Sequence, residues 1–145
     1  MVHGRQPPLP HQVRQLLRQR RTNVVGYELM AAMLGIYMVD GLFPGKAFVR
    51  HFVDNQPALN SIIRGSSKQD DLNSLVGSVW YGCASKLQSY WGQYVRSKTN
   101  IADGPSRQEF QLMKQLGVVR IPFEVDRLCT AADEWMCHPS EETLV

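Results

Sequence analysis

The sequence contains few cysteines, no long apolar run and no acidic residue near its N-terminus. Its three cysteines form no paired C-x-x-C spacing, which argues against a disulfide framework and against a zinc ribbon. No stretch approaches the roughly 18 uninterrupted apolar residues of a membrane span, and the first residues lack the apolar run of a secretory signal. These absences predict an intracellular protein, cytoplasmic or nuclear, without a membrane partner.

Acidic residues are absent before Glu28, although the whole chain carries a net charge of only +3. The same N-terminal segment contains five arginines, which are Arg5, Arg14, Arg18, Arg20 and Arg21. A basic arm of this kind is typical of segments that bind nucleic-acid phosphates, but a solvated helix face has the same composition. Composition leaves both interpretations open.

At 145 residues, the chain has the length of one domain with a single core. Residues 1–10 contain three prolines and are expected to form a disordered lead-in. We expect the domain itself to cover residues 11–123, with an extended segment at 118–123. Residues 124–145 are then a C-terminal extension, in which 126–136 favours a helix.

Apolar spacing predicts alternating helices and strands in an α/β fold. The expected helices are 11–21, 26–39, 57–64, a long one opened by Asp70 or Asp71, and a last one from the capping box Ser106–Glu109 to Gly117. The long helix has the cleanest apolar stripe, which is Leu72, Leu75, Val76, Val79, Trp80, Cys83 and Leu87. Parallel strands are expected near 47–54 and 90–96, flanked by helices. Because two strands make a poor sheet, we expect either a third strand at 22–26 or strands from outside this chain.

Three acidic residues occupy unlike settings in this pattern. Glu28 lies near a helix start, Asp54 ends the first strand, and Asp103 follows the second strand after a short loop. Because ligands collect at the carboxyl ends of parallel strands, Asp54 and Asp103 are expected at the same edge of the sheet. Such oxygens can hold two cations about 3.5 to 4 Å apart and so promote phosphodiester hydrolysis. Single acids at these places are also typical of turns and helix ends, so spacing alone leaves both interpretations open.

Four sequence blocks around these acids stand in a specific order, which is Tyr27–Ala32, Phe52–Leu59, Arg64–Ser67, and Tyr94–Ser97 leading to Asn100–Arg107. From about Leu9 to Phe123 the chain thereby resembles the ribonuclease H-like domain that follows reverse transcriptase in retroelement polyproteins. The resemblance implies a mixed sheet in which Glu28, Asp54 and Asp103 are three of four metal-binding carboxylates. It further implies Mg²⁺ or Mn²⁺ as cofactor, an RNA/DNA hybrid or duplex as partner, cleavage of the RNA strand, and an upstream reverse transcriptase segment.

The chain departs from this family in one respect. The family's first metal-binding Asp lies on a strand well before the Glu-bearing helix, and no Asp or Glu precedes Glu28 here. The resemblance therefore implies an N-terminally truncated domain without its first strands, including the central strand beside the one that ends at Asp54. We expect weakened metal binding and impaired hydrolysis. The alternatives are a non-catalytic nucleic-acid-binding or interaction module, and a fragment that does not fold by itself.

Basic and amide residues around the carboxylates are expected to contact a nucleic-acid backbone. These residues are Asn55, Arg64, Arg96, Lys98, Asn100 and Arg107. Tyr90, Trp91 and Tyr94 could also provide a platform for base stacking. At strand positions, however, we favour core packing for these three aromatic residues.

Overall fold

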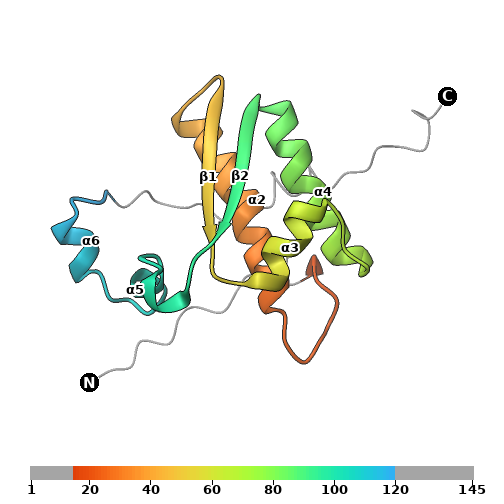
Figure 1. The fold of residues 1–145 in the computed structure, drawn as a ribbon, viewed down its shortest axis with the longest axis horizontal. Helices are drawn as coiled ribbons and strands as arrows, with labels where there is room; N and C mark the ends of the chain where they lie inside the picture. The colour runs from red at the N-terminus through yellow and green to blue at the C-terminus, as the bar shows by residue number, and fades with distance from the viewer. Residues whose placement is uncertain (1–14, 120–145) are drawn as a thin grey trace.

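A computed structural model describes residues 15–119 of the chain as helices packed against a small parallel sheet (Figure 1). The elements are α2 (Val24–Leu42), β1 (Ala47–Val53), α3 (Gln56–Arg64), α4 (Asp70–Ser85), β2 (Gln88–Tyr94), a 3₁₀ turn η1 (Ser97–Thr99), α5 (Asp103–Ser106) and α6 (Gln111–Gln115). The predicted α/β class is confirmed. The segments 1–10, 120–123 and 124–145 lie outside the described residues.

The sheet consists of β1 and β2, which pair in parallel from Ala47 opposite Gln88 to Val53 opposite Tyr94. Parallel pairing was predicted and is confirmed, but β2 begins two residues before the predicted 90–96 strand. Gln88 is buried, and its side-chain amide donates a hydrogen bond to the carbonyl oxygen of Ile36 at 3.2 Å. This contact fixes the start of β2 against α2.

The core lies between the sheet, α2 and α4, and Figure 1 shows α2 crossing behind the two strands. Buried residues of α2, among them Leu29, Met33 and Ile36, belong to one cluster with Leu75 and Val79 of α4. Most of the predicted α4 stripe is therefore confirmed. Two members are not buried, since Trp80 lies partly at the surface and Leu87 turns out of the helix with a φ of 54°.

The third strand proposed at residues 22–26 does not form, because α2 already begins at Val24. Residues 11–14 lie outside the described part, and the helix expected at 11–21 does not continue past Gln15, since residues 16–23 are not helical. These residues fold back onto α2 instead. Gly26 permits this close approach, because a Cβ atom there would lie 2.7 Å from the Leu17 side chain.

The α3 helix follows its sequence signals closely. Asn55 caps its start by accepting a hydrogen bond from the main-chain N–H of Ala58 at 2.9 Å, and Pro57 occupies the first turn. Gly65 ends the helix with a left-handed φ of 75°. The predicted helix is confirmed, and its start fixes the direction of the chain directly after Asp54.

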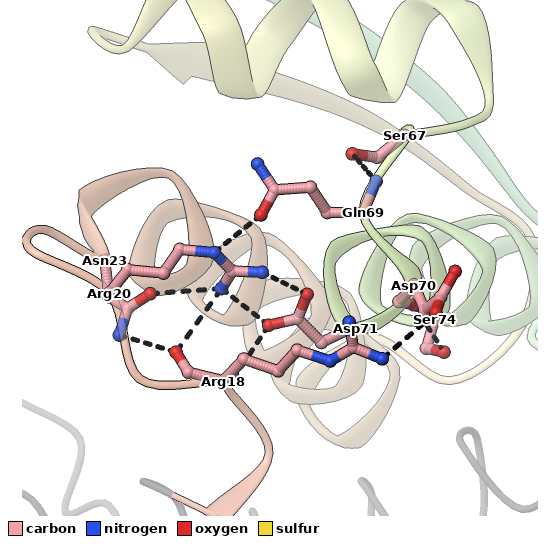
Figure 2. Close-up of polar contacts among 8 residues, drawn as sticks. All are labelled: Arg18, Arg20, Asn23, Ser67, Gln69, Asp70, Asp71 and Ser74. Carbon is pink, nitrogen blue, oxygen red and sulfur yellow. Dashed lines mark hydrogen bonds and ion pairs between the residues drawn. The ribbon is translucent and has the colours of Figure 1, made fainter.

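The α4 helix begins differently from the prediction that Asp70 or Asp71 caps it. The cap position is Gln69, and both acids lie in the first turn. Figure 2 shows why: Asp71 accepts hydrogen bonds from the Arg20 guanidinium, one of them at 2.6 Å, and from the main-chain N–H of Arg18 at 2.9 Å. The first turn of α4 therefore holds the segment that precedes α2.

The last helix expected from Ser106 to Gly117 forms only over Gln111–Gln115 (α6), and a separate short helix, α5, ends at Ser106. Gln108 adopts a φ of 65°, which is incompatible with a continuous helix. The carbonyl oxygen of Gly104 accepts hydrogen bonds from the N–H groups of Arg107 and Glu109, which closes a turn between the helices. The capping-box prediction is wrong, although Gly117, with a φ of 68°, does follow the last helix.

The α2 helix is long and apolar enough to cross a membrane by length and composition, with 19 residues and a mean hydropathy of 1.3 over its best window. Core helices of other proteins pass the same test. Its buried side chains contribute to the hydrophobic core, and it contains the acids Glu28 and Asp40. The absence of a membrane partner stays a prediction.

Candidate functional site

Asp54 lies directly after β1, at the carboxyl end of the sheet. The ladder continues one step past the strands, because the N–H of Val95 donates to the carbonyl oxygen of Val53 at 3.0 Å. The side-chain amide of Asn100 then donates to Oδ2 of Asp54 at 3.1 Å. A direct hydrogen bond therefore joins the segment after β1 to the segment after β2.

Glu28 approaches the same place from α2. Burial raises the pKa of this half-buried carboxyl, and the negative charge of Asp54 raises that pKa further. The two carboxylates are therefore close enough to repel each other when both are ionised. This supports the expectation that the fold unites acids separated by 26 residues in the sequence.

Asp103 opens α5 and is linked to the same loop through Asn100. The N–H of Asp103 donates to the Asn100 carbonyl oxygen at 3.0 Å, and Arg107 lies 3.3 Å from Oδ2 of Asp103 in an ion pair. Asp103 lines a cleft of about 650 Å³ together with Lys98, Asn100 and Glu109. The carboxylate therefore faces a polar cleft between the loop after β2 and α6.

The three acids do not form a complete ligand set. Across residues 15–119, no group of three or more His, Cys, Asp or Glu side chains lies close enough to hold a metal ion. The described residues therefore do not fit a full Mg²⁺ or Mn²⁺ site in this arrangement. The metal-binding role of Glu28, Asp54 and Asp103 stays a prediction.

The residues expected to contact a nucleic-acid backbone fall into two groups. Lys98 and Asn100 line the cleft beside Asp103, and Arg107 pairs with that acid. Asn55 is occupied as the cap of α3, and Arg64 donates from Nε to the carbonyl oxygen of Ser66 at 3.4 Å. Arg96 is exposed beside the 3₁₀ turn. Only the first group lies at the cleft, and all these roles stay predictions.

Two arginines of the basic N-terminal arm form ion pairs with acids of α4. Arg18 pairs with Asp70 at 3.0 Å, and Arg20 pairs with Asp71 (Figure 2). The solvated-helix interpretation does not hold for the described part of this arm, because Arg18 and Arg20 lie outside any helix. Both arginines fasten the chain to α4, so they are less available to phosphates than composition indicates.

Two of the three aromatic residues on β2 are more exposed than predicted. Core packing was favoured for Tyr90, Trp91 and Tyr94, yet Trp91 and Tyr94 are exposed. Tyr90 packs toward the helices, where its hydroxyl lies 2.6 Å from Nδ1 of His51 and its ring meets Trp80 edge to face. Alternation along β2 places Trp91 on the face opposite Tyr90, because successive side chains point to opposite faces. Tyr94 shares the face of Tyr90 but lies at the end of the strand and is exposed.

No protein-family model, curated protein or solved structure matched this chain when it was compared with each. Functional assignment therefore depends on the site geometry and on the sequence blocks that surround it.

Proposed function

We propose that this chain is a ribonuclease H-like domain of retroelement type that acts on nucleic acid, with Glu28, Asp54 and Asp103 as its carboxylates. The observation that supports this best is the meeting of α2, β1 and the loop after β2. Burial and the charge of Asp54 raise the pKa of Glu28, and Asn100 donates a hydrogen bond to Asp54 directly. Three sequence blocks far apart along the chain thus converge on the carboxyl end of β1, as the resemblance implies.

The reaction of such a domain is metal-dependent hydrolysis of the RNA strand in an RNA/DNA hybrid, with Mg²⁺ or Mn²⁺ as cofactor. We expect this activity to be low in the chain alone. Sites of this kind need their groups within about 0.5 Å of the productive geometry. Within residues 15–119 no three His, Cys, Asp or Glu side chains lie close enough together to hold a metal ion, and Asp103 is paired with Arg107.

The proposal is tested with a hybrid that carries a label on its RNA strand, incubated with Mg²⁺ or Mn²⁺. We expect slow RNA cleavage that Asp54→Asn abolishes and Asp70→Asn retains. Asp70 is a suitable control because it is an exposed acid at the start of α4, away from the sheet edge. Equal cleavage by the wild type and by Asp54→Asn would remove Asp54 from the mechanism.

The second candidate is a non-catalytic nucleic-acid-binding module. It is favoured by the lack of a three-member ligand group within residues 15–119 and by a cleft that combines Lys98 with Asn100. Binding of a hybrid or duplex that weakens steeply with added salt, without cleavage in either metal, would support it. The upstream reverse transcriptase partner and the intracellular location stay predictions under both candidates.

A further inference from the structure

The face of the sheet that turns away from α2 carries aromatic side chains at the surface. Along β1, Phe48 and Phe52 are 67% and 50% exposed, and on β2 Trp91 is 59% exposed. The register places Arg50 directly opposite Trp91, on this same face. We call these four residues, Phe48, Arg50, Phe52 and Trp91, the outer sheet face. Within residues 15–119, the buried sides of the strands turn to the helices, and this face stays open.

The outer sheet face is also positively charged. Neither β1 nor β2 contains an acidic residue, and Arg50 has no carboxylate partner within the described part of the chain. Exposed cations stand at both ends of the strands, with Lys46 before β1 and Arg96 after β2. Cations near exposed aromatic rings are complementary to a polyanion that presents flat bases.

We propose that the outer sheet face binds single-stranded nucleic acid, with bases stacked on Phe48, Phe52 and Trp91 and the backbone phosphates near Arg50, Lys46 and Arg96. The face is about 20 Å long, because each of its strands has seven residues that rise about 3.3 Å each. Sheet surfaces of this kind stack two or three bases on their aromatic residues. The three rings therefore suit a short run of about three bases.

Stacking at Trp91 is further favoured by the shape of the surface beside it. A hollow of about 240 Å³ is lined by Trp91, Trp80, Ile63 and Gly92. Tyr90 and Trp91 point to opposite faces of β2 and both line this hollow, so it lies at the open edge of the strand. A base that stacks on Trp91 would have a recess at its side, where apolar contact is available.

A single strand fits this face better than a duplex does. In a duplex the bases are already stacked and paired, and their flat surfaces are not available to side chains, whereas a single strand presents them freely. The outer sheet face runs along the strands, and Asp54 follows the end of β1, two residues after Phe52.

The test measures fluorescence anisotropy of a labelled oligothymidylate of about 12 nucleotides, within the usual site size of such platforms. We expect Trp91→Ala and Phe48→Ala each to weaken binding by about 5- to 100-fold, which is the effect of losing one stacked base. Arg50→Glu should weaken binding and lower its salt dependence. Tyr81→Ala and Lys114→Glu are matched controls, because Tyr81 is an exposed aromatic residue of α4 and Lys114 an exposed cation of α6. Both should bind as the wild type does.

The possible results of this experiment distinguish nucleic-acid binding from misfolding and from protein association. Far-ultraviolet circular dichroism and thermal melts show whether each variant is folded, and the highly exposed Phe48 provides a substitution with little structural cost. Equal affinity of the folded wild type, Trp91→Ala and Phe48→Ala would overturn the proposal. A wild-type dimer in sedimentation that Trp91→Ala converts to a monomer, without nucleic-acid binding, would assign this face to protein association instead. Cleavage of the hybrid is scored separately with Asp54→Asn, so failure of either proposal leaves the other standing.

Discussion

Asn100 donates a hydrogen bond to Asp54 across 46 residues of sequence, at 3.1 Å. The same side chain accepts a hydrogen bond from the N–H of Ala102 at 3.1 Å, which holds the loop that carries Asp103. Asn100 therefore connects the two acids that follow the strands. An amide suits this position because it can donate to a carboxylate and accept from the main chain at once.

Replacing Asn100 with Ala should weaken this connection. We expect a loss of about 0.5–1.5 kcal/mol in the free energy of unfolding, which is typical for one hydrogen bond. Any cleavage of the hybrid should fall as well, because the loop before Asp103 loses its anchor. Urea denaturation measures the first effect, and Asn60→Ala serves as a control, since Asn60 accepts only from Gln56 on the surface of α3. Equal losses in the two variants would show that Asn100 has no special role.

Glu28→Gln should make the protein more stable at neutral pH. The pKa of Glu28 is raised by burial and by the charge of Asp54, so its protonated form is favoured in the folded state. Its stabilising contribution is full below the ordinary pKa of 4.5 and is lost as pH rises through the raised value. We expect a gain of about 0.3–1 kcal/mol at pH 7, a small value because solvent screens a half-exposed group. Denaturation at pH 4 and pH 7 checks this, with no gain expected at the lower pH or from Glu109→Gln.

A divalent cation should stabilise the wild-type protein. Mg²⁺ or Mn²⁺ near Glu28 and Asp54 would relieve their mutual repulsion, and any ligand that binds only the folded state raises the melting temperature. We expect a rise of a few degrees in thermal melts, which Asp54→Asn should abolish. An equal rise in this variant would mean that the cation binds elsewhere.

Much of the fold could be predicted because its signals are local. The α3 helix has Asn55, Pro57 and Gly65 at its ends, and the β1 strand is rich in β-branched and aromatic residues. Element boundaries were predicted wrongly where a contact with a residue far away in the sequence determines where a helix or strand begins. Gln88 begins β2 because it reaches Ile36, which is 52 residues away.

At the candidate site, too, local sequence signals predicted some features, and contacts between distant residues decided the others. The sequence blocks indicated Glu28, Asp54 and Asp103, and the structure brings the first two together. The ion pair of Asp103 with Arg107 and the turn at Gln108 are features that no periodic pattern reveals. Exposure of Trp91 likewise depends on which helices cover the sheet, and that is a property of the whole fold.

Asp71→Asn should destabilise the protein far more than Asp70→Asn does. Both acids bind arginines in the first turn of α4, but the Asp71 side chain is 9% exposed and that of Asp70 is 83% exposed. Loss of the charged contacts to Arg20 and Arg18 should cost about 1.5–3 kcal/mol, whereas an exposed pair contributes about 0–1 kcal/mol. Chemical denaturation at pH 7 compares the two variants, and equal losses would contradict the burial argument.

The same carboxyl predicts acid sensitivity. The Arg20 guanidinium holds the pKa of Asp71 well below its ordinary value of 3.8, and the N–H of Arg18 lowers it further. The stabilisation is therefore present above pH 3.8 and is lost as pH falls through the depressed pKa. The wild type should lose stability in this range more steeply than Asp71→Asn. Parallel slopes for the two proteins would show that other carboxyls control acid unfolding.

Tyr90→Phe should weaken the contact between β2 and β1 on the helix side of the sheet. It removes the hydroxyl that lies 2.6 Å from Nδ1 of His51 and leaves the half-buried imidazole without that partner. We expect a loss of about 1 kcal/mol in the free energy of unfolding, against less than about 0.5 kcal/mol for Tyr81→Phe on the exposed side of α4.

Burial lowers the pKa of His51, so the folded state disfavours its protonation and stability is lost as pH falls below 6.5. Titration of the histidine resonances by NMR measures this directly, and a pKa of His51 above 6.5 would contradict the prediction.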